Sequence, residues 1–209
     1  MLFIMKPILL DLPMPIITPR LLLRPPQPGD GIALNAAVSE SYDNIRHTMP
    51  WAKERPSLEE SEEFVRQSAA NWILKKDDEP YLPLLIFSKK DNILIGATGY
   101  HHIIWEVPCL ETGYWIRTQY SGKGYMTEAV NAITQYAIKQ LKMKRVAITC
   151  DIDNVRSKKI PQRLGFQLEG TLKANRLKPL TDEVGDTVIF ARYDVNNLPT
   201  LTVSWGKNE

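Results

Sequence analysis

The stretch RTQYSGKGYMTEAV, residues 117–130, places Gly122 and Gly124 around a lysine immediately before a segment with helical periodicity. Glycine at both positions permits positive φ angles and removes the Cβ atoms that would keep an anion at a distance. Because the free N–H groups of such a turn and of a helix N-terminus converge, the stretch predicts a phosphate-binding loop. A tight strand-to-helix connection without a ligand is the alternative that the two glycines alone leave open.

Two other phosphate-binding motifs are excluded by their spacing. A dinucleotide-binding fingerprint requires a third small residue where the chain has Thr127, and an acidic residue about 20 positions later, where it has the basic segment 142–145. A P-loop requires a wider spacing between its glycines, followed by Lys-Ser or Lys-Thr. Neither pattern is present in the sequence.

The apolar pattern on both sides of the loop predicts one domain with a mixed sheet and helices on both faces. Ser57 and Glu60 match a capping box at the start of a helix, and Gly165 matches a C-terminal cap. Residues 90–92 indicate a hairpin turn, and residues 47–56 a loop. Strands are expected at about 16–26, 81–89, 93–104, 110–117, 145–152, 166–173 and 184–195, and helices at about 30–39, 57–75, 125–141 and 154–164.

The composition argues against a nucleic-acid-binding protein and against a membrane protein. The chain has 209 residues, and its 26 basic and 24 acidic side chains give a net charge of +2, too balanced for a nucleic-acid-binding surface over the whole molecule. Prolines and charged residues interrupt the apolar N-terminus, so we expect an extended arm rather than a signal or membrane segment. Cys109 and Cys150 have no metal or redox spacing, which favours reduced thiols in a cytoplasmic protein.

Two motifs together resemble the GNAT acetyltransferase superfamily. Gln119-x-x-Gly122-x-Gly124 is similar to its acetyl-CoA pyrophosphate loop, and NVRSKKIPQRLGF, residues 154–166, is similar to its downstream Asn-x-x-Ser segment ending in Gly-Phe. The order of the two motifs, with a helix and a strand between them, also agrees. Within the superfamily the chain resembles the RimJ/RimL-type N-terminal acetyltransferases of ribosomal proteins, through the segments TPRLLLRPPQPGD, MPW with EESEEFVRQS, ETGYWI and LEGTLK.

This resemblance covers residues 16–195 and leaves 1–15 as an N-terminal arm and 196–209 as a C-terminal tail. It implies an α+β (mixed α/β) GNAT fold whose mostly antiparallel sheet of six to seven strands is splayed between the fourth and fifth strands. It also implies transfer from acetyl-CoA, without a metal, to an amine, above all the α-amino group of a protein or peptide. A small amine acceptor and a non-catalytic CoA-binding module remain alternatives. The sequence leaves the oligomeric state open, a dimer included.

Acetyl transfer needs a neutral amine as its nucleophile. A peptide α-amino group, with an ordinary pKa of about 8, is roughly 10% neutral at pH 7, so a weak base is enough. Glu111 is the leading base, because it lies on the strand that enters the phosphate loop. A solvated carboxylate or an ion pair with Arg117 is the alternative for Glu111.

The leaving thiolate requires a proton. Many superfamily members place a tyrosine seven residues after the motif asparagine, where this chain has Pro161. That departure leaves Ser157 as the candidate acid, with a helix-capping role as its alternative. Asn154 is expected to bind the pantetheine arm or to hold the strands apart, and otherwise to cap the helix.

The resemblance also implies a backbone contribution to CoA binding. A bulge at about residues 115–117 is expected to part the strands, so that pantetheine pairs like an added strand and a backbone N–H faces the thioester oxygen. The basic residues Lys123, Arg156, Lys158 and Lys159 are candidates for CoA phosphates. The full set of expected CoA-binding residues is Trp115, Ile116, Arg117, Gln119, Gly122, Lys123, Gly124, Tyr125, Met126, Thr127, Asn154, Ser157 and Lys159.

Aromatic residues and histidines are candidates for the acceptor pocket, with core packing as the alternative for the aromatics. Adjacent histidines on a regular strand point to opposite faces, and His47 is the only histidine outside the pair, so no zinc site is expected. The expected acceptor-binding residues are Trp51, Tyr100, His101, His102 and Trp105.

Overall fold

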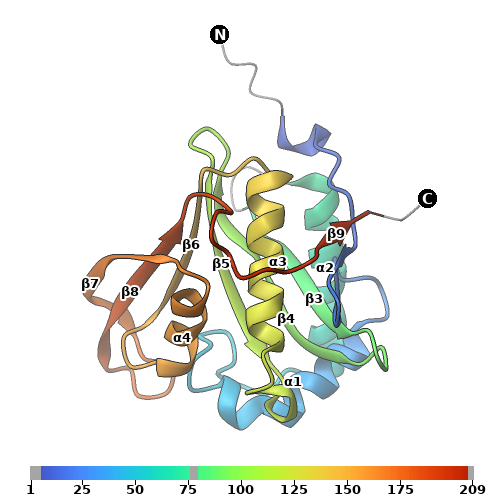
Figure 1. The fold of residues 1–209 in the computed structure, drawn as a ribbon. Coiled ribbons are helices and arrows are strands. Elements are labelled where there is room, and N and C mark those ends of the chain that lie inside the picture. Colours follow the sequence, from blue (N-terminus) through green and yellow to red (C-terminus); the bar gives the residue numbers. More distant parts are fainter. Residues whose placement is uncertain (1–5, 76–79, 207–209) are drawn as a thin grey trace.

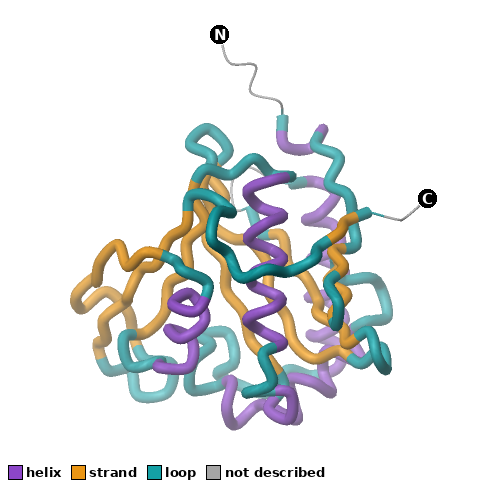
Figure 2. Tube along the Cα trace, in the orientation of Figure 1, coloured by secondary structure: helices purple, strands orange, loops and turns teal. Residues whose placement is uncertain are grey.

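The computed structural model describes residues 6–75 and 80–206. Figure 1 shows one twisted sheet between two helical layers, with α3 and α4 on one face and α1 and α2 on the other. Figure 2 shows the same layers by type of element. The helices are η1 (Pro7–Leu9), α1 (Gly31–Ile45), α2 (Leu58–Leu74), η2 (Thr118–Tyr120), α3 (Tyr125–Lys139) and α4 (Val155–Arg163). The strands are β1 (Ile16–Ile17), β2 (Leu21–Arg24), β3 (Leu82–Ser88), β4 (Leu94–Ile104), β5 (Cys109–Ile116), β6 (Arg145–Asp151), β7 (Gln167–Leu177), β8 (Val184–Arg192) and β9 (Ser204–Trp205).

The described residues form a nine-stranded sheet with the order β7-β8-β6-β5-β4-β3-β2-β1-β9. Every neighbouring pair is antiparallel except β5 and β6, which confirms the mixed, mostly antiparallel fold. The sheet therefore has more strands than the expected six to seven. The additional strands are β1 and β9, which lie at one edge and have only two residues each.

The extra edge strands arise from contacts that a linear pattern does not reveal. The single strand expected over 16–26 folds back at Thr18, whose N–H donates to the carbonyl of Leu21, and becomes β1 and β2. Residues 196–206 of the expected C-terminal tail cross over α3 (Figure 1), and Trp205 packs edge-on against Tyr136 with ring centroids 5.7 Å apart. The β9 strand of this segment pairs with β1, so the sheet extends past the boundary predicted at residue 195.

The main helices form where the sequence places their caps and apolar faces. Ser57 and Glu60 make the predicted capping box, with Glu60 N–H to Ser57 Oγ at 3.1 Å and Ser57 N–H to Glu60 Oε2 at 2.7 Å. α1 continues past the expected end at Ser39 because Tyr42 and Ile45 extend its buried face. α3 buries one apolar face in the main core, and Gly165 ends α4 with φ +68°. No helix of the described residues combines the length and hydrophobicity needed to cross a bilayer.

The opening between β5 and β6 determines where a ligand can enter. The two strands pair only at Cys109–Arg145, Leu110–Val146 and Glu111–Ala147. Beyond these pairs β5 stays with β4 as far as Ile116, and β6 stays with β8 as far as Asp151. Each half of the sheet therefore keeps its outer partner while the shared edge opens, as Figure 1 shows.

The predicted splay is present, but its expected cause is wrong. The β4–β5 register is regular from Gly96–Ile116 to His101–Glu111, so no bulge lies at residues 115–117. In the β4–β5 pairing the register shift lies at the other end of β4, between His101 and Ile104, and a separate shift in the β3–β4 pairing lies between Ile86 and Phe87.

Candidate active site

The phosphate loop between β5 and α3 has the predicted backbone. Gly122 and Gly124 have φ angles of +77° and +80°, and a Cβ on Gly122 would meet no atom within 4 Å. The first bond of α3 runs from the Glu128 N–H to the Gly124 carbonyl, so the N–H groups of residues 124–127 have no helical acceptor. These amides lie at the positive end of the helix dipole and beside open space, an arrangement that could hold an anion.

An ion pair that the sequence analysis missed braces this loop. Arg20, from the turn between β1 and β2, contacts Glu128 in the first turn of α3 at 2.5 Å and donates to the Lys123 carbonyl at 3.1 Å. Its guanidinium also lies 4.4 Å from the ring centre of Tyr125, and Thr18 donates to Glu128 at 2.6 Å. Glu128 would repel a diphosphate, and its partner Arg20 offsets that charge.

The polar side chains before the loop contact α1. Arg117 pairs with Glu40 of α1, and Gln119 donates to the same carboxylate at 3.0 Å. The alternative partnership of Arg117 with Glu111 is therefore wrong. Ile116 packs against the main core, and Met126 lies within it with 6% exposure. Because these two side chains pack in the core, only their backbone atoms could contact CoA.

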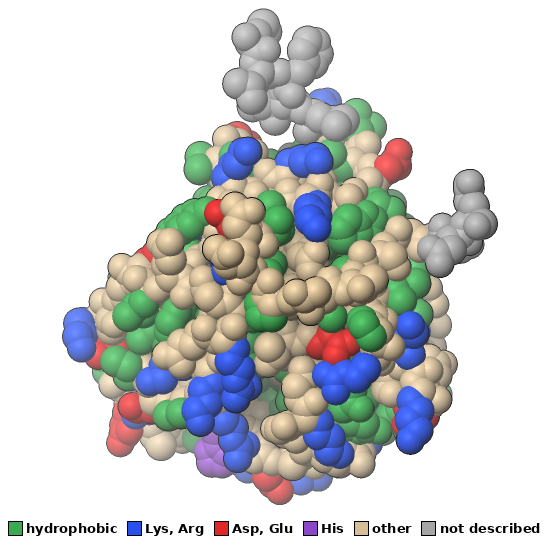
Figure 3. All heavy atoms as spheres, in the orientation of Figure 1, with side chains coloured by type: hydrophobic (Ala, Val, Ile, Leu, Met, Phe, Trp, Pro, Cys, Tyr) green, Lys and Arg blue, Asp and Glu red, His purple; other side chains and the backbone are tan. Residues whose placement is uncertain are grey.

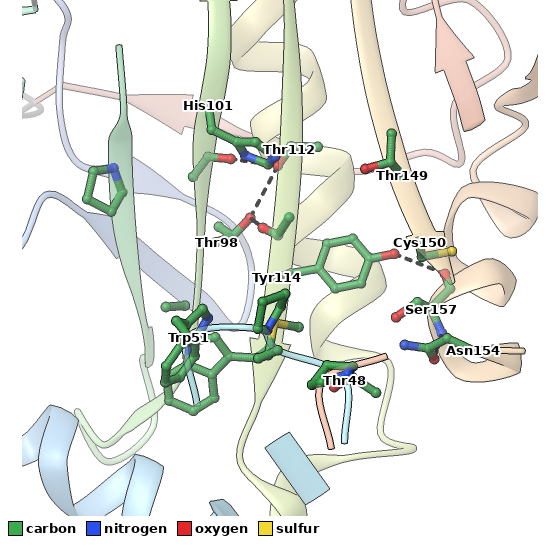
Figure 4. Close-up of a pocket in the computed structure, with 18 of the residues that line it drawn as sticks. Thr48, Trp51, Thr98, His101, Thr112, Tyr114, Thr149, Cys150, Asn154 and Ser157 are labelled. Carbon is green, nitrogen blue, oxygen red and sulfur yellow. Dashed lines mark hydrogen bonds between the residues drawn. The ribbon is translucent and has the colours of Figure 1, made fainter. Parts of the chain in front are cut away.

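A cavity of about 1010 Å³ passes through the opening in the sheet. Its walls come from α1 and the loop after it, from α2, from strands β3 to β7, and from the start of α4, and Figure 4 shows part of this lining. The Arg117 N–H donates to the Ile95 carbonyl of β4, so by strand alternation the N–H groups of Tyr114 and Ile116 face the parted β6. The open edge thus carries unpaired backbone donors next to the cavity.

Asn154 and Ser157 line this cavity at the start of α4. Asn154 Oδ1 accepts the Ser157 N–H at 3.0 Å, so its capping role is present. The sequence analysis missed Tyr114, which Figure 4 shows reaching across the opening to α4, where its hydroxyl donates to the Ser157 carbonyl at 3.0 Å. Burial raises the pKa of Tyr114 well above its ordinary value, and it raises the pKa of the nearby Cys150 thiol to about 11.

Basic residues gather on α4 beside the phosphate loop, and Figure 3 shows Lys and Arg concentrated on this face. Lys158 donates to the Ile152 carbonyl and so already has a partner. Arg156 and Lys159 are exposed, and Lys123 lies 5.6 Å from the ring centre of Tyr120.

Only part of the predicted acceptor-binding set lines the cavity. Trp51 and Trp115 line it with ring centroids 6.3 Å apart, and His101 lines it as well. Tyr100 is fully buried on the opposite face and donates to the Ile133 carbonyl at 2.7 Å, so its predicted acceptor role is wrong. His102 and Trp105 are likewise not among the residues that line this cavity.

Glu111 does not line the cavity itself but lies behind side chains that do. Thr149 donates to its Oε2 at 3.2 Å, and His101 Nε2 lies 3.8 Å from the same oxygen. Both neighbours line the cavity, whereas Glu111 is not among the lining residues. Burial lowers the pKa of His101, and the Glu111 carboxylate opposes that shift in part.

The glycine loop at the start of α3 and the open edge of β5 are together suited to an enzyme that binds a diphosphate-bearing thioester. Residues 20–167 match the family model of the acetyltransferase (GNAT) domain. The chain therefore belongs to the GNAT acetyltransferase family, and it is an acetyl-CoA-dependent N-acetyltransferase.

Three relatives illustrate the similarity. The ribosomal-protein-serine acetyltransferase of Escherichia coli (strain K12) is 27% identical over 158 residues, 74% of this chain and 86% of the relative. A microcin self-immunity acetyltransferase in complex with acetyl-CoA and AMP superposes with a TM-score of 0.76 at 24% identity, over 84% of this chain and 93% of the other. RimL, a ribosomal α-N-protein acetyltransferase in complex with coenzyme A, gives 0.75 at 24% identity, over 85% and 96%. The two structures support the fold.

Proposed function

We propose that the protein acetylates the N-terminal α-amino group of a protein or peptide, as the name of its Escherichia coli relative states for a ribosomal protein. The observation that carries this proposal is the continuous cavity, which joins the Trp51 and His101 wall to Asn154 and Ser157 on the other side of the sheet. An extended acceptor can enter from one side while the thioester arrives from the other. The free cysteines agree with a cytoplasmic compartment.

In this proposal different groups of the chain accept the proton of the amine, stabilise the oxyanion and protonate the leaving thiolate. Glu111 accepts the proton of the attacking amine, through His101 or a water at the cavity wall, because its carboxylate does not itself reach the cavity. A backbone N–H of Tyr114 or Ile116 stabilises the oxyanion that develops on the thioester carbonyl. Ser157 relays a proton from water to the departing thiolate, so that its own hydroxyl is restored in the same step.

The phosphate groups of CoA are assigned to the amides of residues 122–127. Arg156, Lys159 and Lys123 are proposed to add charge, since their side chains stand near that loop or on α4. Trp51 and Trp115 are proposed to contact the first residues of the acceptor.

An acceptor screen tests this function. Purified enzyme with acetyl-CoA is offered peptides that differ only in their first three residues, next to polyamines, aminoglycosides and amino acids, and acetylated products are identified by mass spectrometry. Acetylation of peptide α-amines that depends on the first residues supports the proposal. Turnover of small amines alone would replace it with the small-molecule alternative, and turnover of nothing would favour a CoA-binding module.

A further inference from the structure

Three potential metal ligands converge at the end of β4. The imidazole nitrogens of His101 and His102 and the carboxylate of Glu111 each offer one atom, and these atoms all lie within 4.8 Å of one another. His101 Nε2 is 3.8 Å from Glu111 Oε2, and His102 Nδ1 is 3.5 Å from Glu111 Oε1.

The register shift in β4 brings the two histidines together. On a regular strand their rings would point to opposite faces, which is why the sequence predicts no metal site. The structure contradicts that reasoning, because His102 has φ +49° and the pairing jumps from His101–Glu111 to Ile104–Cys109. The bulge places the two rings with centroids 4.9 Å apart. A left-handed conformation at a non-glycine residue costs about 1–2 kcal/mol, and such strain is concentrated at functional sites.

We infer that His101, His102 and Glu111 bind a divalent transition-metal ion of the zinc class. Two imidazole nitrogens and one carboxylate oxygen are a common donor set for zinc with an open fourth position. Ligands about 2.0–2.2 Å from a tetrahedral ion lie roughly 3.3–3.6 Å apart. Because the three donor atoms lie within 4.8 Å of one another, side-chain movements of about 1 Å would bring them to this spacing. Magnesium and calcium, which prefer oxygen ligands, fit this set poorly.

The neighbours and the solvent exposure of the three proposed ligands are compatible with reversible binding of a metal ion. Thr149 donates to Glu111 Oε2 at 3.2 Å and orients the carboxylate, as outer hydrogen bonds do for metal ligands. The side chains of His101 and Glu111 are 32% and 27% exposed and that of His102 is 74% exposed, so an ion can enter from solvent.

A bound ion inhibits the transfer rather than assisting it. It occupies the Glu111 lone pairs that accept the proton of the amine, and its open position takes up water or the amine itself. The inhibition rests on the proposed role of Glu111 as the base, whereas the binding of the ion does not.

Metal binding is tested first, independently of activity. Chelator-treated enzyme is titrated with Zn²⁺ by calorimetry and with Co²⁺ by visible absorption, and one ion per chain is expected. His102→Asn keeps a residue that tolerates the left-handed conformation, and its affinity should fall at least about tenfold. His47→Ala and Cys109→Ser, outside the cluster, should bind as wild type does. Uptake that is unchanged in His102→Asn, or absent from wild type at submillimolar Zn²⁺, would overturn the site.

Inhibition is measured second, against each variant's own metal-free rate. Acetylated acceptor is quantified by mass spectrometry, because a thiol assay would fail where zinc binds the CoA thiol. Zn²⁺ should inhibit wild type, EDTA should reverse the effect, and His102→Asn should need at least about tenfold more Zn²⁺. Stoichiometric uptake of Zn²⁺ without inhibition would refute the inhibitory role. If the metal-free enzyme acetylates none of the acceptors, the proposed function is refuted, and the result of the binding experiment still stands. A thermal unfolding midpoint near wild type confirms that His102→Asn is folded.

Discussion

Substitution of Gly122 by alanine perturbs the phosphate loop without removing a side chain. The φ angle of +77° imposes a cost of about 1–2 kcal/mol on any residue with a Cβ. For a chain of this size we expect the unfolding midpoint to fall by about 2–8 °C. The new Cβ also enters the open space that the amides face, and the loss of one hydrogen bond to a phosphate, about 1.5–3 kcal/mol, weakens CoA binding roughly 10- to 100-fold.

Gly29 supplies a matched control for this experiment. It has φ +98°, and a Cβ there would also meet no atom within 4 Å. Its N–H bonds to Glu62, away from the phosphate loop. Gly29→Ala should therefore lose comparable stability by differential scanning fluorimetry while its calorimetric Kd for CoA stays at the wild-type value. Equal CoA affinity in the two variants would refute the assignment of the loop.

Four further predictions follow from the site. Glu111→Gln should lower kcat on the order of a hundredfold with little change in the KM for acetyl-CoA, and steady-state kinetics with unchanged kcat would remove Glu111 from the mechanism. Ser157→Ala should slow turnover at saturating acetyl-CoA at least about tenfold, and a full rate would refute its role as the acid. Arg20→Ala should weaken CoA binding roughly three- to fivefold by calorimetry, because Glu128 is then left unpaired beside the diphosphate. Adding Glu128→Gln should restore part of the affinity for CoA. No recovery in the double variant would contradict the role of the Arg20–Glu128 ion pair at the loop. Cys150, whose pKa burial raises to about 11, should be alkylated slowly at pH 8 and about tenfold faster per pH unit up to pH 11, and more slowly with CoA present; rapid labelling at pH 7 in peptide mapping would contradict its burial.

Local signals in the sequence were sufficient for the loop and the main helices. Glycine is nearly required where φ is positive, so Gly122 and Gly124 report the backbone conformation directly. The capping box at Ser57 and Glu60 likewise depends on residues three apart, which a sequence pattern contains.

Features that depend on distant contacts were not predictable. The brace of Arg20 on Glu128 joins residues 108 positions apart, and no periodicity announces it. Alternation along β4 could not identify the face of Tyr100 until the sheet order was known, because that order decides which face meets α3. The bulge at His102 then reverses the expected direction of one histidine, since a single extra residue changes which side chains share a face.

The central claim is that bare backbone amides at the start of α3 hold the CoA diphosphate. A crystal structure of the acetyl-CoA complex tests it most directly. The account predicts diphosphate oxygens within about 3.2 Å of N–H groups of residues 122–127, with the pantetheine arm between β5 and β6. A diphosphate held by the α4 side chains Arg156 and Lys159, with the loop amides facing water, would contradict it.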